Sequence, residues 1–162
     1  MVAKLIILLT ALSWCAFSSA LSGDKEAPIK IVSDRAEQNE QEGTATYEGS
    51  VIVQQGSIKI NADKVIVTTD AKRGDKIVAT GNPAHYQQIQ NTKEGLVLAS
   101  ANIINYSIKN EKIGLIKDAS LEQNGITITG NQIDYDVQAA TATASSEQNK
   151  KNRIEMIIPP TK

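Results

Sequence analysis

The sequence has few of the residue types on which most catalytic and nucleic-acid-binding sites depend. Its 162 residues include one Cys, one His, one Trp and one Phe, and aromatic residues make up 4% of the chain. Seventeen Lys and Arg are balanced by 18 Asp and Glu, so the formal net charge is −1. Because a nearly neutral chain lacks the basic face that binds a phosphate backbone, we expect no nucleic-acid partner.

Patterns typical of a catalytic or metal site are also missing. His85 is the only His, and no residue near it in the sequence is placed to orient it as a catalytic base. We expect no cofactor and no metal ion, since His and Cys clusters are lacking and no phosphate-binding or calcium loop is present. Asp134 and Asp136, like Glu40 and Glu42, have the spacing of a carboxylate pair, but a solvated strand face gives the same spacing. We therefore expect a non-enzymatic protein.

A short apolar segment opens the chain. Lys4 precedes an apolar run from Leu5 to Leu12, and Ser18-Ser19-Ala20 supplies the small residues that signal peptidase requires. The run is too short to span a bilayer comfortably. We expect residues 1–20 to be a signal peptide, cleaved after Ala20, and residues 21–162 to form a single exported domain.

Cys15 offers an alternative, because a lipoprotein signal ends at a lipidated Cys. The bulky Trp14 directly before it disfavours that alternative, since a small residue is required there. Cleavage after Ala20 would remove the only Cys, Trp and Phe of the chain. The exported protein would then form no disulfide, and its stability would come from backbone pairing and packing.

Apolar and polar residues alternate with a period of two from residue 28 onward. Examples are Ile29-Lys30-Ile31, residues 57–60 (SIKI) and residues 125–128 (GITI). Such alternation places one face of a strand on a core and the other in water. Turn residues rich in Gly and Asn separate these segments. We expect an all-β fold of stacked antiparallel strands, with one candidate helical turn at residues 36–42 (AEQNEQE).

The strands recur as a unit. Ile31, Ile60, Ala99 and Ile128 hold equivalent places and are separated by 29, 39 and 29 residues. Each unit has a small residue followed by Asp or Asn where the apolar positions shift by one. An extra residue of this kind is a β-bulge, which bends the strand and resets its faces. We expect each unit to turn a corner between two sheet walls that enclose an apolar interior. The corners are Ser33-Asp34, Ala62-Asp63, Ala101-Asn102 and Gly130-Asn131.

Three stretches of the chain carry a family resemblance. They are residues 27–34 (APIKIVSD), 48–69 (EGSVIVQQGSIKINADKVIVTT) and 81–88 (GNPAHYQQ). From about Gly23 to Pro159 the chain resembles the OstA/LptA-like family of periplasmic lipopolysaccharide transport proteins. The resemblance implies a twisted, open β-jelly roll located in the periplasm. It also implies head-to-tail stacking into a bridge between the inner and outer membranes, along whose apolar groove lipopolysaccharide moves.

The partners that this resemblance implies are lipopolysaccharide, bound through its lipid A portion, and three proteins. The proteins are an LptC-like inner-membrane component, an LptD-like outer-membrane component and further copies of the chain itself.

The repeat supplies the aliphatic and tyrosine side chains that such a groove needs. At roughly 0.8 kcal/mol per buried methylene, one acyl chain gains on the order of 10 kcal/mol. From alternation alone, an ordinary filled sandwich core accounts for these residues, whereas the resemblance favours a groove. The predicted groove residues are Ile29, Ile31, Ile52, Ile58, Ile60, Val65, Val67, Tyr86, Ile104, Tyr106, Ile108, Leu121, Ile126, Ile128, Ile133 and Tyr135.

The strand register is ambiguous in residues 43–56, 77–89 and 113–124. In the first of these, Val51-Ile52-Val53 is apolar without interruption, so either face could be inside. Counting three residues on from Gly49, Gly81 and Asp118 selects one register. It turns Ile52, Ala84, Tyr86 and Leu121 inward.

Strands near both ends of the chain are predicted to carry the assembly. An open edge can pair with another chain by β-augmentation. Pairing of the C-terminal edge of one molecule with the N-terminal edge of the next does not close, so it yields an open filament. The alternative is that both edges are covered within the chain. The predicted edge residues are Ile29, Lys30, Ile31 and Val32 at one end and Ile154, Glu155, Met156, Ile157 and Ile158 at the other.

Three other functions are alternatives for this sequence. An LptC-like component of the same pathway would keep its N-terminal segment as a membrane anchor, which N-terminal sequencing of the exported protein would detect. A structural envelope β-protein would have a filled core and bind no lipid. A small periplasmic carbohydrate enzyme would need an acid/base site that the sequence does not supply.

Overall fold

A computed structural model describes residues 24–70, 75–90, 95–146 and 153–160. The predicted signal peptide, residues 1–20, lies outside the described residues, as do its cleavage site and Cys15. The only helical element of the described part is a short 3-10 helix, η1 (Asp24–Glu26). No helix in these ranges has the length and apolar character needed to cross a membrane.

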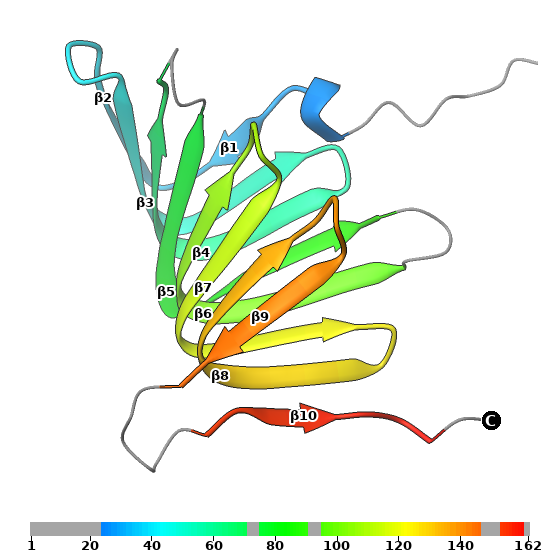
Figure 1. Ribbon diagram of the computed structural model, residues 1–162. Helices are drawn as coiled ribbons and strands as arrows, with labels where there is room; N and C mark the ends of the chain where they lie inside the picture. Colours follow the sequence, from blue (N-terminus) through cyan, green and yellow to red (C-terminus); the bar gives the residue numbers. More distant parts are fainter. Residues whose placement is uncertain (1–23, 71–74, 91–94, 147–152, 161–162) are drawn as a thin grey trace, which may run out of the picture.

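The described strands form one antiparallel sheet whose order follows the chain (Figure 1). The main order is β1-β3-β4-β5-β6-β7-β8-β10, with β2 also paired to β3 and β9 to β8. The expected all-β fold of stacked antiparallel strands, an open twisted jelly roll, is confirmed. The strands are β1 (Lys30–Val32), β2 (Arg35–Asn39), β3 (Thr44–Gln55), β4 (Ile58–Thr68), β5 (Lys76–Ile89), β6 (Leu96–Ser107), β7 (Lys112–Gln123), β8 (Ile126–Asp136), β9 (Thr141–Ser145) and β10 (Glu155–Ile157).

The helical turn predicted at residues 36–42 is wrong. Residues 35–39 form strand β2, which pairs with residues 44–48 of β3 in an unbroken register. The Glu and Gln residues favour a helix locally, but the sheet hydrogen bonds offered by β3 outweigh that preference.

Each long strand bends at a corner, and the corners lie side by side. The pairing register breaks after Glu48, Asn61, Thr80, Ser100 and Ile116. The corners predicted at residues 62–63 and 101–102 are therefore confirmed as register breaks, while residues 33–34 separate β1 from β2 and residues 130–131 lie opposite the break in β7.

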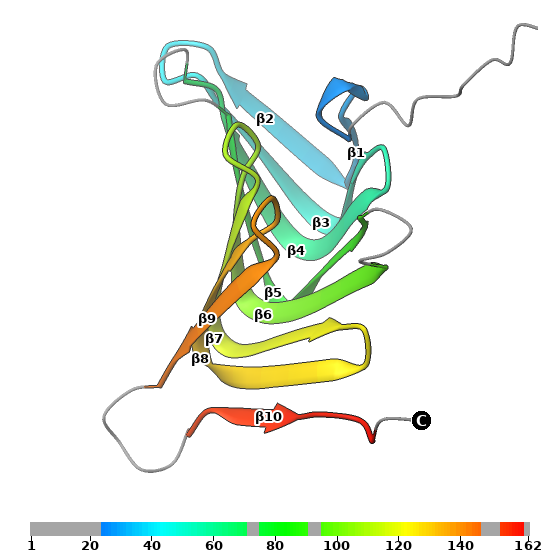
Figure 2. The same cartoon turned by 45° about the vertical axis from the view of Figure 1, so that its right-hand side comes forward.

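The line of corners divides the sheet into two walls, which Figure 2 shows diverging from it. Wall A consists of β1, residues 51–55, 58–61, 84–89, 96–100, 119–123 and 126–130, and β10. Wall B consists of β2, residues 44–48, 64–68, 76–80, 103–107, 112–116 and 132–136, and β9. β1 and β2 lie at one end of the sheet, and β9 and β10 lie at the other.

The apolar interior lies between the walls. Tyr86 of wall A and Tyr106 of wall B meet there, with their ring centroids 5.8 Å apart. The largest fully buried side chains come from both walls: Tyr86, Tyr106, Tyr135, Ile58, Ile60, Ile77, Ile104, Ile113, Leu115, Ile133, Val51 and Val53.

The β3 corner depends on Gly49, and Gly49→Ala is expected to lower the free energy of unfolding by about 1–3 kcal/mol. Gly49 has a φ of 83°, and a Cβ atom there would meet the side chain of Asp34, with 2.7 Å to its Cβ. Asp34 cannot easily retreat, because its N–H donates to the carbonyl of Glu48 at 3.1 Å. Denaturant unfolding measures the loss.

Gly114→Ala is the matched control for that substitution. A Cβ atom at Gly114 would come no closer than 3.4 Å to its nearest neighbour, Asp134 Oδ1, and the backbone there is not left-handed. We expect its effect to stay within about 0.5 kcal/mol. Equal losses for the two variants would contradict this account of the corner.

Candidate functional site

Most of the predicted groove residues lie between the two walls. Those that are at most 2% exposed are Ile58, Ile60, Val65, Tyr86, Ile104, Tyr106, Leu121, Ile133 and Tyr135. Ile31, Val67, Ile108 and Ile128 are partly buried against this core. Ile29 and Ile126 have the strand parity of the interior but lie at its margin, where each is 38% exposed.

Ile52 faces away from the interior, so its predicted inward position is wrong. It is 39% exposed, while Val51 and Val53 on either side are fully buried. The count of three residues suits the β5 corner, where residues 81–83 are unpaired. The β3 corner has only two unpaired residues, 49–50, and a difference of one residue exchanges the two faces of a strand.

The interior of the isolated chain is filled rather than open, which corrects the expectation of a solvent-accessible groove. The side chains predicted to line that groove pack against one another across the two walls. The physical reason is that apolar walls without lipid lower their free energy by burying each other's surface. A lipid would have to replace these contacts.

Several interior residues were missed by the sequence prediction. They are Val51, Val53, Ala62, Ile77, Ala79, Val97, Ala99, Ala101, Ile113, Leu115, Ala119 and Val137, whereas Ala84 was predicted to face inward and is fully buried. Ile77-Val-Ala79 and Ile113-Gly-Leu115 do alternate, but their registers were ambiguous. The registers would have been determined by the number of unpaired residues at each corner, which is two in β3 and three in β5.

A polar network covers part of the interior at the tip of wall A. Asp24 of η1 accepts hydrogen bonds from Ser57 N at 2.6 Å, Ser57 Oγ at 2.7 Å and Gln88 Nε2 at 2.9 Å. Tyr86 donates its hydroxyl to Gln88 Oε1 at 2.8 Å. Burial raises the pKa of the Tyr86 phenol far above its ordinary value, so the hydroxyl stays a neutral donor.

A second network joins the tips of the two walls. Gln90 Nε2 donates to Tyr135 Oη at 3.0 Å and to the Val137 carbonyl at 3.3 Å. Gln123 Nε2 donates to Gln90 Oε1 at 2.9 Å, and Tyr135 donates to Gln123 Oε1 at 3.1 Å. Gln90 and Gln123 belong to the wall A side, whereas Tyr135 and Val137 belong to wall B, so these bonds hold the mouth of the interior together. The sequence prediction missed every amide in both networks, because a Gln at an inward position interrupts the alternation of apolar and polar residues on which the prediction was based.

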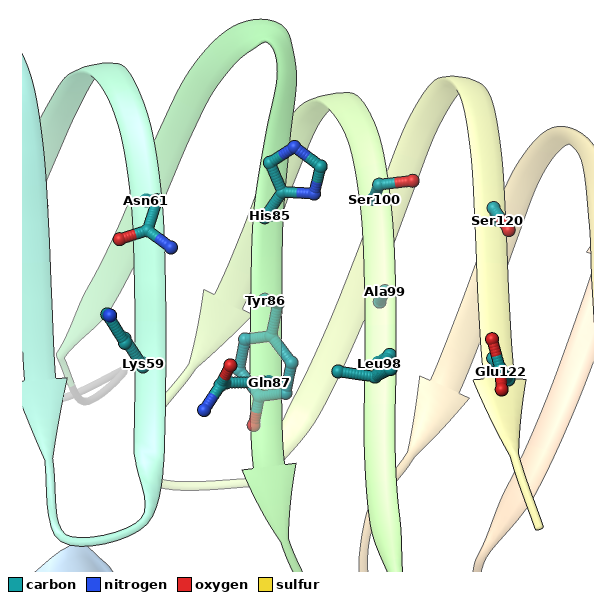
Figure 3. A pocket seen from close by; sticks show the side chains of 10 residues that line it. All are labelled: Lys59, Asn61, His85, Tyr86, Gln87, Leu98, Ala99, Ser100, Ser120 and Glu122. Atoms are coloured by element: carbon teal, nitrogen blue, oxygen red, sulfur yellow. The ribbon is translucent and has the colours of Figure 1, made fainter. Parts of the chain in front are cut away.

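The outer face of wall A carries a separate hollow of about 340 Å³ (Figure 3). His85 lies here, and Leu98 is the one large aliphatic side chain of its lining. The other outward side chains are polar: Lys59, Asn61, Gln87, Ser100, Ser120 and Glu122. This composition does not suit acyl chains.

The candidate carboxylate pair of Asp134 and Asp136 lies on the outer face of wall B, since the alternate residues Ile133 and Tyr135 face the interior. The N–H of Ala139 and the ammonium of Lys112, which is 3.3 Å from Asp136 Oδ2, hold the pKa of the Asp136 carboxyl below its ordinary value. A glycosidase general acid needs a raised pKa instead. A carboxyl whose pKa is lowered in this way does not match that requirement.

The two ends of the sheet carry the predicted assembly edges. β1 pairs only with β3, and β10 only with β8, among the described strands. Each therefore has one edge to which no described strand is paired. Aliphatic side chains are unusually exposed there, with Val32 at 51%, Met156 at 55% and Ile157 at 56%. Exposed apolar side chains on an unpaired edge are typical of a site where another chain adds.

Three comparisons connect this arrangement with known proteins. The model of a family described as LptA/(LptD N-terminal domain) LPS transport protein matches residues 30–141. The lipopolysaccharide export system protein LptH of Pseudomonas aeruginosa is 36% identical over 165 aligned residues, which cover 98% of this chain and 94% of the relative. LptA of Haemophilus influenzae is 33% identical over 161 residues, covering 97% and 91%.

The fold agrees with a solved structure of this group. The crystal structure of LptH, the LptA homologous periplasmic component of the lipopolysaccharide transport device of Pseudomonas aeruginosa, superposes with a TM-score of 0.77 at 33% identity. The match covers 85% of this chain and 99% of that one.

Proposed function

Because the chain belongs to the LptA and LptD N-terminal domain family of lipopolysaccharide transport proteins, we propose that it carries lipopolysaccharide across the periplasm as one segment of a protein bridge. The observation that carries this proposal is the continuous apolar interior between walls A and B, which runs from Ile31 of β1 to Ile128 of β8 and Ala144 of β9. The protein acts as a transport component, and the energy for transport comes from elsewhere.

The acyl chains of the lipid would lie between the walls, in contact with the buried aliphatic side chains. Burial at roughly 0.8 kcal/mol per methylene keeps each chain out of water. Because similar Ile and Val residues recur along the sheet, neighbouring positions bind the acyl chains with similar affinity. The free-energy barriers to movement from one position to the next are therefore low. The walls would part to admit the lipid, which breaks the Gln90–Tyr135 and Gln123–Tyr135 hydrogen bonds at the mouth.

The bridge would form by head-to-tail pairing of sheet edges. The β10 edge of one copy adds to the β1 edge of the next, so the apolar interiors join end to end. The terminal copies would offer the same edges to an LptC-like component at the inner membrane and an LptD-like component at the outer membrane. The lipid A portion of lipopolysaccharide is the part that enters the interior.

Photo-crosslinking tests the carrier function. A photoreactive amino acid at Tyr86 or Tyr106 is expected to give lipopolysaccharide adducts in cells that make this lipid, because both positions face the interior. The neighbouring positions Gln87 and Asn105 face the opposite side of the same strands and serve as matched controls. Equal yields at inward and outward positions, or no adducts at any, would refute the proposal; mass analysis of gel-purified adducts provides the readout.

A further inference from the structure

A row of alternating amide and aliphatic side chains crosses wall A at its tip. Its members occupy the outermost inward-facing position of six successive strands: Gln55, Ile58, Gln88, Val97, Gln123 and Ile126. Gln55 pairs with Ile58, Gln88 with Val97, Val97 with Gln123, and Gln123 with Ile126. The pairing of Lys59 with Gln87 places Ile58 beside Gln88. We call these residues the glutamine row.

The amides of this row already hold oxygen acceptors, all supplied by the chain itself. Gln88 Nε2 donates to the Asp24 carboxylate at 2.9 Å, and Gln55 Nε2 donates to the Ala27 carbonyl at 3.2 Å. Gln123 Nε2 donates to the side-chain carbonyl of Gln90 at 2.9 Å. Residues 24–27 and Gln90 therefore act as internal occupants, and they reveal that the row recognises carbonyl and carboxylate oxygens.

The row lies at the boundary between the apolar interior and solvent. One step deeper on the same strand faces are Ile60, Tyr86 and Leu121, which are all buried. On the solvent side, β3 and β7 end in turns at residues 56–57 and 124–125. In an acylated sugar, ester and amide carbonyls occupy the corresponding boundary, since each joins a hydrocarbon chain to a polar headgroup.

We propose that the glutamine row binds the ester and amide carbonyls that link the acyl chains of a glycolipid to its sugars, and that residues 24–27 and Gln90 occupy the row while lipid is absent. This inference rests on the proposed function. Neighbouring strands are about 4.8 Å apart, so successive amides are spaced by roughly 10 Å with an aliphatic side chain between them. A bare hydrocarbon entering the interior would displace the occupants and leave the amides without acceptors, whereas a glycolipid supplies new ones.

Replacing the amides by thioethers of similar length tests the row. In the purified exported chain, Gln88→Met and Gln123→Met are each expected to weaken lipopolysaccharide binding about 5- to 10-fold, the effect of losing one buried hydrogen bond. Binding of N-phenyl-1-naphthylamine, a fluorescent apolar probe without a carbonyl, is expected not to weaken, because this probe offers the amides no acceptor. Gln87→Met, on the outer face, is the control and should leave both affinities unchanged.

A second variant leaves the row intact and removes an occupant. Asp24→Ala is expected to strengthen lipopolysaccharide binding several-fold, because Gln88 no longer has to release a carboxylate. If the glutamine variants weaken both ligands by the same factor, or if Asp24→Ala weakens lipopolysaccharide binding, the inference is overturned. If the unmodified chain binds the apolar probe but no lipopolysaccharide, the proposed function itself fails.

Discussion

Two variants of this chain, each blocked at one end, are expected to be monomeric alone and to form a one-to-one dimer when mixed. The N-terminal block is Ile29→Lys with Val32→Lys, and the C-terminal block is Ile157→Lys with Ile158→Lys. All four side chains are exposed, so the substitutions cost the single chain little. Lysines on an edge oppose strand addition, because pairing would bury their charge.

The mixed dimer forms because each partner keeps one unmodified edge. The free β10 edge of the first variant meets the free β1 edge of the second, and both remaining ends are blocked, so growth stops at two copies. Analytical ultracentrifugation distinguishes this outcome from a two-fold symmetric contact, in which one of the variants alone would still dimerise. Ile89→Lys with Leu96→Lys is the matched control, since both side chains are exposed but lie away from the sheet ends. That variant should assemble like the unmodified chain.

Ile60→Ala is expected to lower the free energy of unfolding by about 2–5 kcal/mol, whereas Ile52→Ala changes it by less than about 1 kcal/mol. Both residues are isoleucines in paired strands, β3 and β4, but Ile60 is fully buried between the walls and Ile52 lies on the outer face. Truncating Ile60 removes packed methyl groups and leaves a cavity. Urea unfolding of the two variants gives the difference.

The same pair tests whether the interior is filled in the absence of lipid. If the walls stood apart in solution, Ile60 would contact water and its truncation would cost as little as that of Ile52. Lipid added in excess should reduce the difference in the free energy of unfolding between the two variants, because acyl chains fill the cavity that the truncation of Ile60 leaves. A loss at Ile52 equal to that at Ile60 would contradict the assigned register of β3.

The repeat predicted the corners at residues 62–63 and 101–102, because a small residue before Asp or Asn coincides there with a change of apolar parity. Register within β3 was predicted wrongly, since three apolar residues in a row carry no alternation and the corner length varies from two to three residues. Strand β2 was missed as a strand because its polar residues pair with β3 without burying a face. The assignment of residues to one wall or the other therefore depended on the strand pairing, which the sequence alone does not reveal.

The polar part of the candidate site was beyond prediction for a different reason. Gln55 and Gln88 are buried and donate hydrogen bonds to Ala27 and to Asp24 of η1, contacts across about 30 residues of chain for Gln55 and about 60 for Gln88. In the sequence each amide simply interrupts an apolar series. The resemblance to lipopolysaccharide transport proteins pointed to the apolar residues alone.

Because the strand order follows the chain, the length of this molecule is proportional to the number of its strands. Each additional hairpin would extend the sheet by roughly 10 Å along its axis, while every existing cross-section stays as it is. Duplication of a single 29-residue unit in the gene would thus lengthen the protein without redesigning it. Such a scaffold can become longer or shorter by changing the number of its hairpins.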